Sequence, residues 1–485
     1  MTGTAPQARQ PDDERPGLTR REFVRGAGAA VLAVPGVYAS LARRLPGRPG
    51  SSGTPQLPEQ HLLQDLRIVA SDGVEVFEPP LHSAVVTALL ALEEGAAELA
   101  GARDELEARL RRLDTRYPGT PPGLGVAVGW GLPYFRRFVP AQAERLLPVD
   151  LRASAGDHTR RVLTDTARFP SDPPGVVLEE NDVAVLVRSD SLDHVQEAVE
   201  SLFGDPAGAL RITSVRRGFA GGGFGGGPSL PKQLALAAGV PGAGLIPDGA
   251  ELFLGFTSTQ KQITGRERIA NFETLGYTDV GPEGYFAHGT HMHVSHLYED
   301  LEAWYGRFTF SDRVASTFRP GLEVPAGALT VPQAPEDAER ASGVEGDYRR
   351  HGRIGHSGSI QPASRLQHPV TGPDGVVYER GTPIPHRADF NTLDHPFAWS
   401  GDPERDRYGT AARAGLHFVV FNPSSDDFNR GRLAMDGQLP GGRALRFAAD
   451  KRGQGFNEVL TTTHRQNFLV PPRAHRSFPL SELRR

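Results

Sequence analysis

Four histidines lie close together in one stretch of the sequence: His288, His291, His293 and His296. Imidazole is a common ligand of copper and zinc, so this stretch raises the possibility of a metal site. In a single strand, side chains alternate between two faces, which places His291 and His293 on one face and the outer two on the other. A metal enzyme based on this stretch would therefore need His291, His293 and a ligand from elsewhere. The alternative is a polar strand face that lines a pocket or packs on the opposite half of the fold.

The composition narrows the chemistry further. The chain has 485 residues, no cysteine and a formal net charge of -5. The lack of thiols excludes disulfides, thiolate zinc sites, cysteine-ligated haem and iron-sulfur clusters, and leaves His, carboxylate and Tyr as metal ligands. The basic residues are spread along the chain without a long cluster, so no nucleic-acid partner is indicated.

The segment Thr19–Leu41 indicates export. It begins Thr-Arg-Arg-Glu-Phe, with Arg20 and Arg21 adjacent, and continues as a short, weakly apolar run that ends near a small-residue cleavage site at Ala39. This is the pattern of a twin-arginine signal. We expect the twin-arginine translocation machinery as a partner, an extracytoplasmic location and no stable membrane span after processing. Such substrates cross the membrane folded, which favours a redox cofactor inserted beforehand.

The chain is expected to fall into four parts. Residues 1–42 form the signal, and the Pro- and Gly-rich residues 43–60 form a flexible linker. Residues 61–235 and 236–485 form two structural halves, the second with the pocket described below, and the glycine-dense stretch 221–227 lies near their boundary.

Hydrophobic periodicity predicts the elements of the first half as strand, helix, strand, strand, helix, strand. In that order the predicted ranges are 83–92, 103–113, 123–130, 182–188, 192–202 and 210–219. This order is that of a ferredoxin-like unit. The second half repeats it in outline, with predicted strands at 285–298, 415–421 and 467–470 and predicted helices at 300–305, 311–318 and 425–435. The fold class predicted is α+β, of the dimeric α/β-barrel type: two ferredoxin-like halves with antiparallel sheets facing each other and peripheral helices.

Several segments together resemble the dye-decolorising (DyP-type) peroxidase superfamily of haem proteins. They are DVAVLVRSDSLDHVQEAVESL, LRITSVRRGF, GTHMHVSHLYEDLEAWY, AGLHFVVFNPSSDDF and NFLVPP. The resemblance covers most of residues 80–475. It implies bound haem b, peroxide and an unknown small molecule as substrates, and a divergent twin-arginine-exported subgroup.

The resemblance also implies distal residues. The family's Gly-x-x-Asp-Gly motif should follow Gly255, but Ser258 stands where its aspartate is expected, and Asp279 replaces it only if the loop is rearranged. Of the family's paired distal arginines the second matches Arg380, whereas Glu379 stands at the first. A serine hydroxyl is a poor proton acceptor at neutral pH, so the distal chemistry is expected to be altered.

The family's iron ligand is a histidine upstream of this arginine, and two residues compete for the role. His356 is preferred over His368, because Pro369 restricts the backbone beside His368 and a Pro-Asp-Gly turn follows. The leading hypothesis is thus an exported haem oxidoreductase with Arg380 stabilising charge. The alternatives are a non-catalytic haem-binding or interaction protein and the haem-free metal enzyme.

Overall fold

A computed structural model describes residues 56–71, 74–92, 96–205, 208–256, 278–331, 341–371, 375, 377–393 and 413–484. The predicted signal and the linker up to residue 55 lie outside these ranges. Burial begins at Glu59, close to the start expected for the folded part. Within the described ranges, no helix combines the length and the apolar character needed to cross a bilayer.

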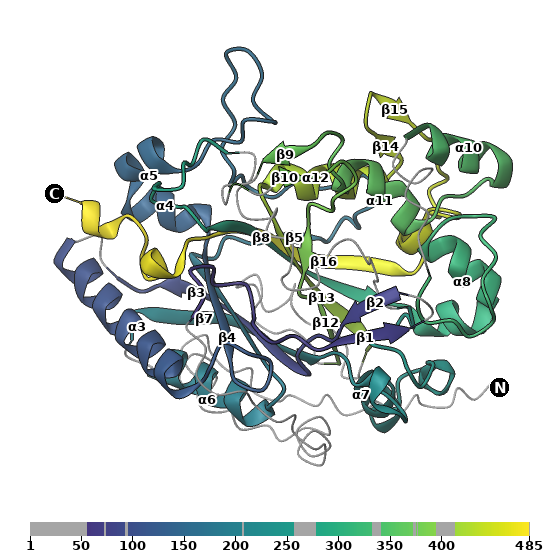
Figure 1. The fold of residues 1–485 in the computed structure, drawn as a ribbon, viewed down its shortest axis with the longest axis horizontal. Helices are drawn as coiled ribbons and strands as arrows, with labels where there is room; N and C mark the ends of the chain where they lie inside the picture. Colours follow the sequence, from purple (N-terminus) through teal and green to yellow (C-terminus); the bar gives the residue numbers. More distant parts are fainter. Residues whose placement is uncertain are drawn as a thin grey trace, which may run out of the picture.

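The N-terminal half is a four-stranded antiparallel sheet with two helices on one face. Its elements are β3 (His82–Leu90), α3 (Ala96–Arg116), β4 (Gly125–Trp130), β6 (Val183–Ser189), α6 (Leu192–Phe203) and β7 (Leu210–Phe219). The strands lie in the order β7-β3-β6-β4. This is the predicted ferredoxin-like unit, and α3 and α6 lie together at its outer side (Figure 1).

Local sequence explains these elements. Ser191 caps α6 by accepting a hydrogen bond from the His194 backbone N–H, and apolar residues at helical spacing then face the sheet. In β3, Ala84 and Val86 pack under the helices, whereas Val85 packs in a separate cluster on the other face.

The C-terminal half repeats the arrangement with larger insertions. Its sheet contains β8 (Thr290–Glu299), β12 (Phe390–Thr392), β13 (Gly415–Asn422) and β16 (Leu460–Val470), in the order β12-β13-β8-β16. Its helical elements are η4 (Ala303–Arg307), α8 (Phe310–Thr317), α10 (Ala341–His351), α11 (His356–Ser364) and α12 (Ser425–Met435). Shorter strands are β9 (Val370–Thr371), β10 (Val377–Tyr378) and β11 (His386–Arg387), and η5 (Gly455–Glu458) precedes β16.

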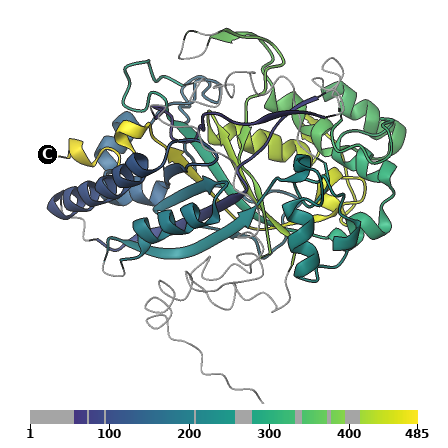
Figure 2. The ribbon, with the colours of Figure 1, turned by 60° about the horizontal axis from the view of Figure 1, so that its bottom comes forward.

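The two sheets close into one barrel. β16 pairs with β4 through Leu469 and Trp130, and β12 pairs with β7 through Asn391 and Phe219. Every pairing around the ring is antiparallel. Figure 2 shows the strands crossing the middle of the molecule, with the helices of each half at opposite ends. The structure therefore confirms the predicted fold class.

The remaining described elements lie outside this ring. They are β1 (Ile68–Ser71), β2 (Val74–Phe77), α4 (Leu132–Phe138), α5 (Pro140–Leu146), β5 (Val177–Leu178), α7 (Leu230–Ala237), β14 (Gln438–Leu439) and β15 (Arg443–Ala444). β1 and β2 form a hairpin beside the barrel, and β5 extends the sheet parallel to β16.

An apolar core fills the inside of the barrel where the two sheets face each other. Val85 and Leu186 of the first half meet Met292, Val419 and Phe468 of the second. All of these side chains are fully buried. Contact between the inner faces therefore joins the halves.

Several predicted element bounds agree closely with the structure, but α3 and β16 each begin seven residues before the predicted 103 and 467, and the start of β8 also differs. β7 and α12 have the predicted ends. β8 begins at Thr290 and not at Tyr285, because residues 281–288 form turns and His288 adopts a left-handed φ of 67° that interrupts an extended strand. The connection between the halves runs from the end of β7 to the start of β8 and includes the predicted boundary.

Buried histidines make the stability of this fold sensitive to acid. Burial lowers the pKa of His61, His82, His291, His293, His356, His386 and His417 below 6.5, so these rings stay neutral in the folded protein. The unfolded chain binds protons below pH 6.5 that the folded state does not. The contribution of these histidines to stability is therefore fully present above pH 6.5 and is lost progressively as the pH falls.

We predict that His293→Gln reduces this acid dependence. One proton uptake is removed, so the slope of unfolding free energy against pH between 6.5 and 5 should fall by up to about 1.4 kcal/mol per pH unit. Urea unfolding at several pH values measures it. His158→Gln, at an exposed position, is the control and should keep the original slope. An unchanged slope for His293→Gln would contradict the prediction.

Candidate functional site

A cavity of about 380 Å³ lies against the outer face of the C-terminal sheet. Its floor comes from alternate residues of neighbouring strands, because every second side chain points to this face. They are Ser295, Leu297 and Glu299 of β8, Leu416, Phe418 and Val420 of β13, and Arg387 and Asp389 beside β12. Phe318, Phe428 and Met435 add to the lining, with Leu252, Leu254 and Phe256 from the first half's connection. The cavity is thus largely apolar, with a few polar groups.

His356 lines this cavity at the first residue of α11. Its ring stacks on Phe456, with ring centres 4.4 Å apart and 23° between planes. Gly355 fixes the start of the helix, because a Cβ there would stand 2.1 Å from the Phe318 carbonyl oxygen. The backbone can approach so closely only at glycine. The imidazole is therefore held in one place.

The imidazole of His356 is suited to bind a metal. Its Nδ1 is buried and makes no hydrogen bond to the described residues. Burial, with smaller effects from Arg387 and Arg432, lowers its pKa to about 3. The ring is therefore neutral at physiological pH, and neutral imidazole is the form that ligates metals.

Two buried carboxyl groups share the cavity. Glu299 ends β8, and its buried Oε2 has no hydrogen-bond partner in the part of the chain that the structure describes. Burial and the nearby Asp389 raise the pKa of Glu299 to about 8. Burial also raises the pKa of Asp389, although Arg387 lies 3.8 Å away and partly offsets this. Glu299 thus carries a proton at neutral pH, as expected for an acid-base group.

The other site residues expected from the sequence lie elsewhere. His368, Glu379 and Arg380 are exposed and do not line the cavity. Asp279 accepts a hydrogen bond from the Val149 backbone N–H, also away from the cavity. Ser258 lies outside the described residues. Sequence reasoning missed Glu299, Arg387 and Asp389; the alternation of Arg387 and Asp389 with Ala388 and Phe390 spans only four residues, too few to identify a strand face.

The histidine-rich strand shows the expected alternation. His293 faces outward, where it stacks on Phe428 and hydrogen-bonds Asn467 and Ser295. His296 points the other way and hydrogen-bonds Thr463. His288 precedes the strand and pairs with Glu59 at 3.0 Å. Among the described residues, no group of three or more His, Asp or Glu side chains is arranged to hold a metal.

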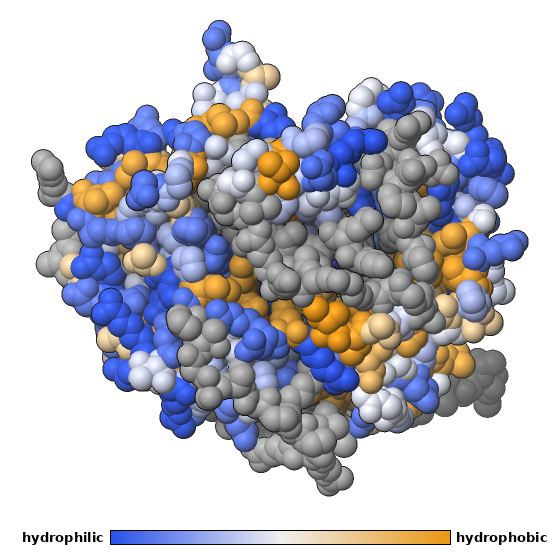
Figure 3. Space-filling view, viewed as in Figure 1, coloured by the Kyte–Doolittle hydropathy of each residue, from blue (hydrophilic) through white to orange (hydrophobic). Residues whose placement is uncertain are grey.

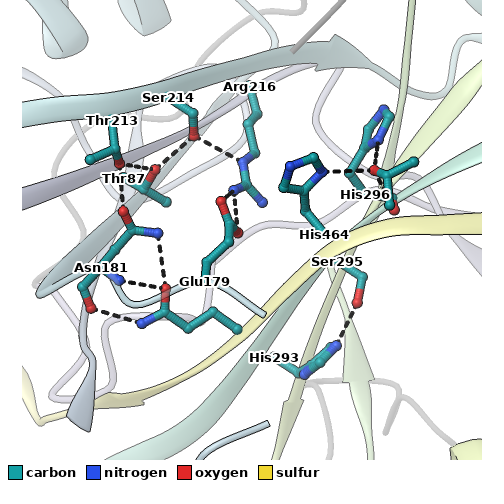
Figure 4. A network of polar contacts seen from close by, with 12 residues as sticks. Thr87, Glu179, Asn181, Thr213, Ser214, Arg216, His293, Ser295, His296 and His464 are labelled. Atoms are coloured by element: carbon teal, nitrogen blue, oxygen red, sulfur yellow. Dashed lines mark hydrogen bonds and ion pairs between the residues drawn. The ribbon is translucent and has the colours of Figure 1, made fainter. Parts of the chain in front are cut away.

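His296 belongs to a polar network inside the barrel (Figure 4). His417, His296 and His464 lie side by side in register on three adjacent strands. A bulge at Thr463 places its hydroxyl between two of these rings, 2.6 Å from His296 Nδ1 and 3.0 Å from His464 Nδ1.

The rest of this network is built around a buried ion pair. Arg216 pairs with Glu179 at 2.5 Å, and both side chains are almost fully buried. Ser214 accepts a further hydrogen bond from Arg216 and contacts Thr87. The network also includes Asn181 of the first half and Gln466 of the second, which hydrogen-bond to each other and so join the two halves (Figure 4). Hydrogen bonds within the network satisfy these buried polar side chains, so a structural role accounts for their presence.

The surface around the β1–β2 hairpin carries apolar side chains. Ile68 is 38% exposed. Figure 3 shows apolar residues near the middle of this face, bordered by hydrophilic ones. Phe77, at the end of β2, lines the cavity.

Comparison with known proteins places the chain in a family. A model described as a family of unknown function (DUF7405) matches residues 80–472. The chain belongs to this family. No curated protein matches the sequence.

Solved structures of DyP-type peroxidases are similar in fold to this family member. Ferric DtpA from Streptomyces lividans is 16% identical with a TM-score of 0.51, and the match covers 86% of this chain and 96% of that one. A DyP-type peroxidase from Cellulomonas bogoriensis is 19% identical, with a TM-score of 0.48 and coverage of 86% and 96%. A DypB variant from Rhodococcus jostii RHA1, solved in complex with heme, is 14% identical, with a TM-score of 0.44 and coverage of 82% and 96%. At these identities the likeness shows the fold alone.

The buried ion pair gives a stability prediction. Glu179→Leu leaves the Arg216 charge uncompensated in the barrel and should cost about 3–5 kcal/mol of unfolding free energy. Adding Arg216→Met should recover most of the loss, because the unpaired charge is removed. Urea unfolding of the single and double variants measures both effects.

The exposed pair Arg136–Asp165 supplies the control, since its side chains are 60% and 64% exposed. Asp165→Leu should change stability by less than about 1 kcal/mol. A Glu179→Leu variant as stable as this control would contradict the assigned role of the buried pair.

Proposed function

We propose that this chain is an exported haem b-binding oxidoreductase that uses peroxide to oxidise a small molecule. One observation carries the proposal: a neutral histidine, His356, with an unsatisfied buried Nδ1, lines an apolar cavity on the outer face of the C-terminal sheet. The fold shared with ferric DtpA supports it.

The residues present fit a haem group. The cavity volume falls in the range typical of small-molecule and cofactor sites, and most of its lining is apolar. The chain has no thiol, so histidine is the natural axial ligand, and His356 would hold the iron. Bound haem would supply the redox chemistry and the site at which peroxide reacts.

The chain's own groups would manage protons and charge around it. Glu299 holds a proton at neutral pH and releases it near pH 8. A general acid-base group is most effective when its pKa lies close to the working pH. Asp389 lies on the same cavity wall, and Arg387 places a positive charge beside it. In this proposal these groups take the acid-base and charge-stabilising roles. The resemblance assigns the acid-base role to Ser258 or Asp279 and the charge-stabilising role to Arg380, and both assignments are still hypotheses. The apolar lining limits access of bulk water.

A non-catalytic haem-binding protein is the second candidate. It is favoured by the exposed position of Arg380, which leaves the residue expected from the resemblance outside the cavity lining. Peroxide turnover by the haem-loaded protein separates the two, because only the enzyme consumes peroxide.

His356→Ala should abolish or strongly shift the Soret band of protein folded with haem supplied, because alanine offers no axial ligand. Urea unfolding should remain cooperative. His368→Ala is the matched control, since His368 is exposed, and its spectrum should match the starting protein. The reverse pattern would move the ligand to His368, and a spectrum unaffected by either change would refute haem ligation by these residues.

Export by the twin-arginine route is tested separately. Replacing both Arg20 and Arg21 with Lys should leave the precursor in the cytoplasm, because recognition depends on the guanidinium pair and not on charge alone. Cell fractionation measures it. A double change Arg9→Lys with Arg15→Lys, upstream of the pair, is the control and should be exported. Normal export of the Arg20, Arg21 variant would remove the basis for this part of the proposal.

A further inference from the structure

Arg188 is a buried cation on the wall of the cavity. It lies on β6 directly opposite Ser83 of β3 and is only 7% exposed. Both residues line the same cavity as His356. Burial lowers the pKa of Arg188 to about 10, so the guanidinium remains charged at neutral pH.

No carboxylate in the described part of the chain neutralises this charge. The one hydrogen bond that the Arg188 side chain makes to described residues runs from Nη2 to the carbonyl oxygen of His61. Glu78, which also lines the cavity, forms an ion pair with Arg67 at 3.1 Å. A buried charge without a counter-charge lowers the stability of the folded protein. A contribution to stability therefore does not explain why Arg188 is present.

Other buried arginines of this chain show the contrast. Arg216 has Glu179 at 2.5 Å, and Arg465 has Asp172 at 2.5 Å. Both pairs are almost fully buried on both sides. These two buried guanidinium groups are neutralised by carboxylates, whereas Arg188, at the cavity, has no such partner among the described residues.

Neutral hydrogen-bond donors stand beside Arg188. Ser83 contributes a hydroxyl, and His386 lines the cavity with a ring whose pKa burial, His61 and Arg188 keep well below its usual value. The neutral ring of His386 can donate one N–H. The ring of His61 lies 6.1 Å from that of His386. Leu63, Leu66, Pro79, Pro80 and Pro385 form apolar walls.

We propose that Arg188 anchors an anion site in this cavity that binds the carboxylate group of a small, partly apolar molecule. The guanidinium fork matches two carboxylate oxygens, Ser83 and His386 supply neutral donors, and the apolar walls contact the rest of the ligand. Binding supplies the counter-charge that the described chain lacks. The inference goes beyond the proposed function, since none of these contacts requires haem. The carboxylate has two possible sources, a free organic acid or a propionate of bound haem.

Calorimetry with benzoate and the uncharged benzamide, on protein prepared without haem, tests the site. Benzoate should bind more tightly than benzamide. Arg188→Met should weaken benzoate about tenfold to a hundredfold, the size expected for loss of a charge-assisted hydrogen-bond pair, and leave benzamide unchanged. Arg136→Met removes an exposed arginine and should bind benzoate normally. Equal benzoate affinity in the Arg188→Met and starting proteins would overturn the proposal, as would failure of the starting protein to prefer benzoate.

Two further variants keep the test decisive if Arg188→Met does not fold. Arg188→Lys keeps the charge without the fork, and Ser83→Ala removes one donor, so each should weaken benzoate several-fold without affecting benzamide. Unchanged benzoate binding in both would also overturn the site.

A haem titration distinguishes the two sources of carboxylate. If the ligand is a haem propionate, Arg188→Met should weaken haem but not haem dimethyl ester. If it is a free acid, both haem forms should bind Arg188→Met normally while benzoate is lost. Failure of haem to bind at all would refute the proposed function and leave the benzoate result as an independent test of the anion site.

Discussion

The closure of two four-stranded sheets into one barrel is the constraint on which the rest of the molecule depends. Each closing seam uses a single residue pair, Leu469 with Trp130 and Asn391 with Phe219. The inner faces are committed to joining the halves, as the buried cluster around Met292 and Phe468 shows. The outer faces, and the strand ends at which Ser83 and Arg188 reach the cavity, remain for other uses. In the N-terminal half α3 and α6 fill that face, whereas in the C-terminal half it carries the cavity.

Strand alternation then sorts polar residues into two environments. Residues that point into the barrel, such as Arg216 and His296, find partners from neighbouring strands. Glu299, on the outer face, lines the cavity and has an oxygen without a hydrogen-bond partner among the described residues, and Arg188, on the same side of β6 as Ala184 and Leu186, also reaches the cavity and has no carboxylate partner there. Buried polar groups are normally satisfied, so such exceptions indicate where stability has been given up for binding or chemistry.

Much of the fold could be predicted from the sequence because its long strands and helices have strong periodicity. β7 and α12 have the predicted ends, and the order of elements identified the ferredoxin-like halves. The site was harder to predict. Arg387 and Asp389 belong to a segment of very short strands, which periodicity hardly detects, and Glu299 acquires its high pKa only from burial and a neighbour distant in sequence. Motif matching pointed to Arg380, but no local pattern reveals whether a side chain reaches a cavity.

The cavity also determines which sulfur atom an oxidant would meet first. The chain has no cysteine and three methionines. Met292 is sealed in the barrel core, and Met1 lies outside the described residues, whereas Met435 lines the cavity. Thioethers are readily converted to sulfoxides, which are polar and fit poorly against apolar walls. Any oxidant generated in the cavity would therefore oxidise Met435, the last residue of α12, before it reached Met292 in the core that joins the halves.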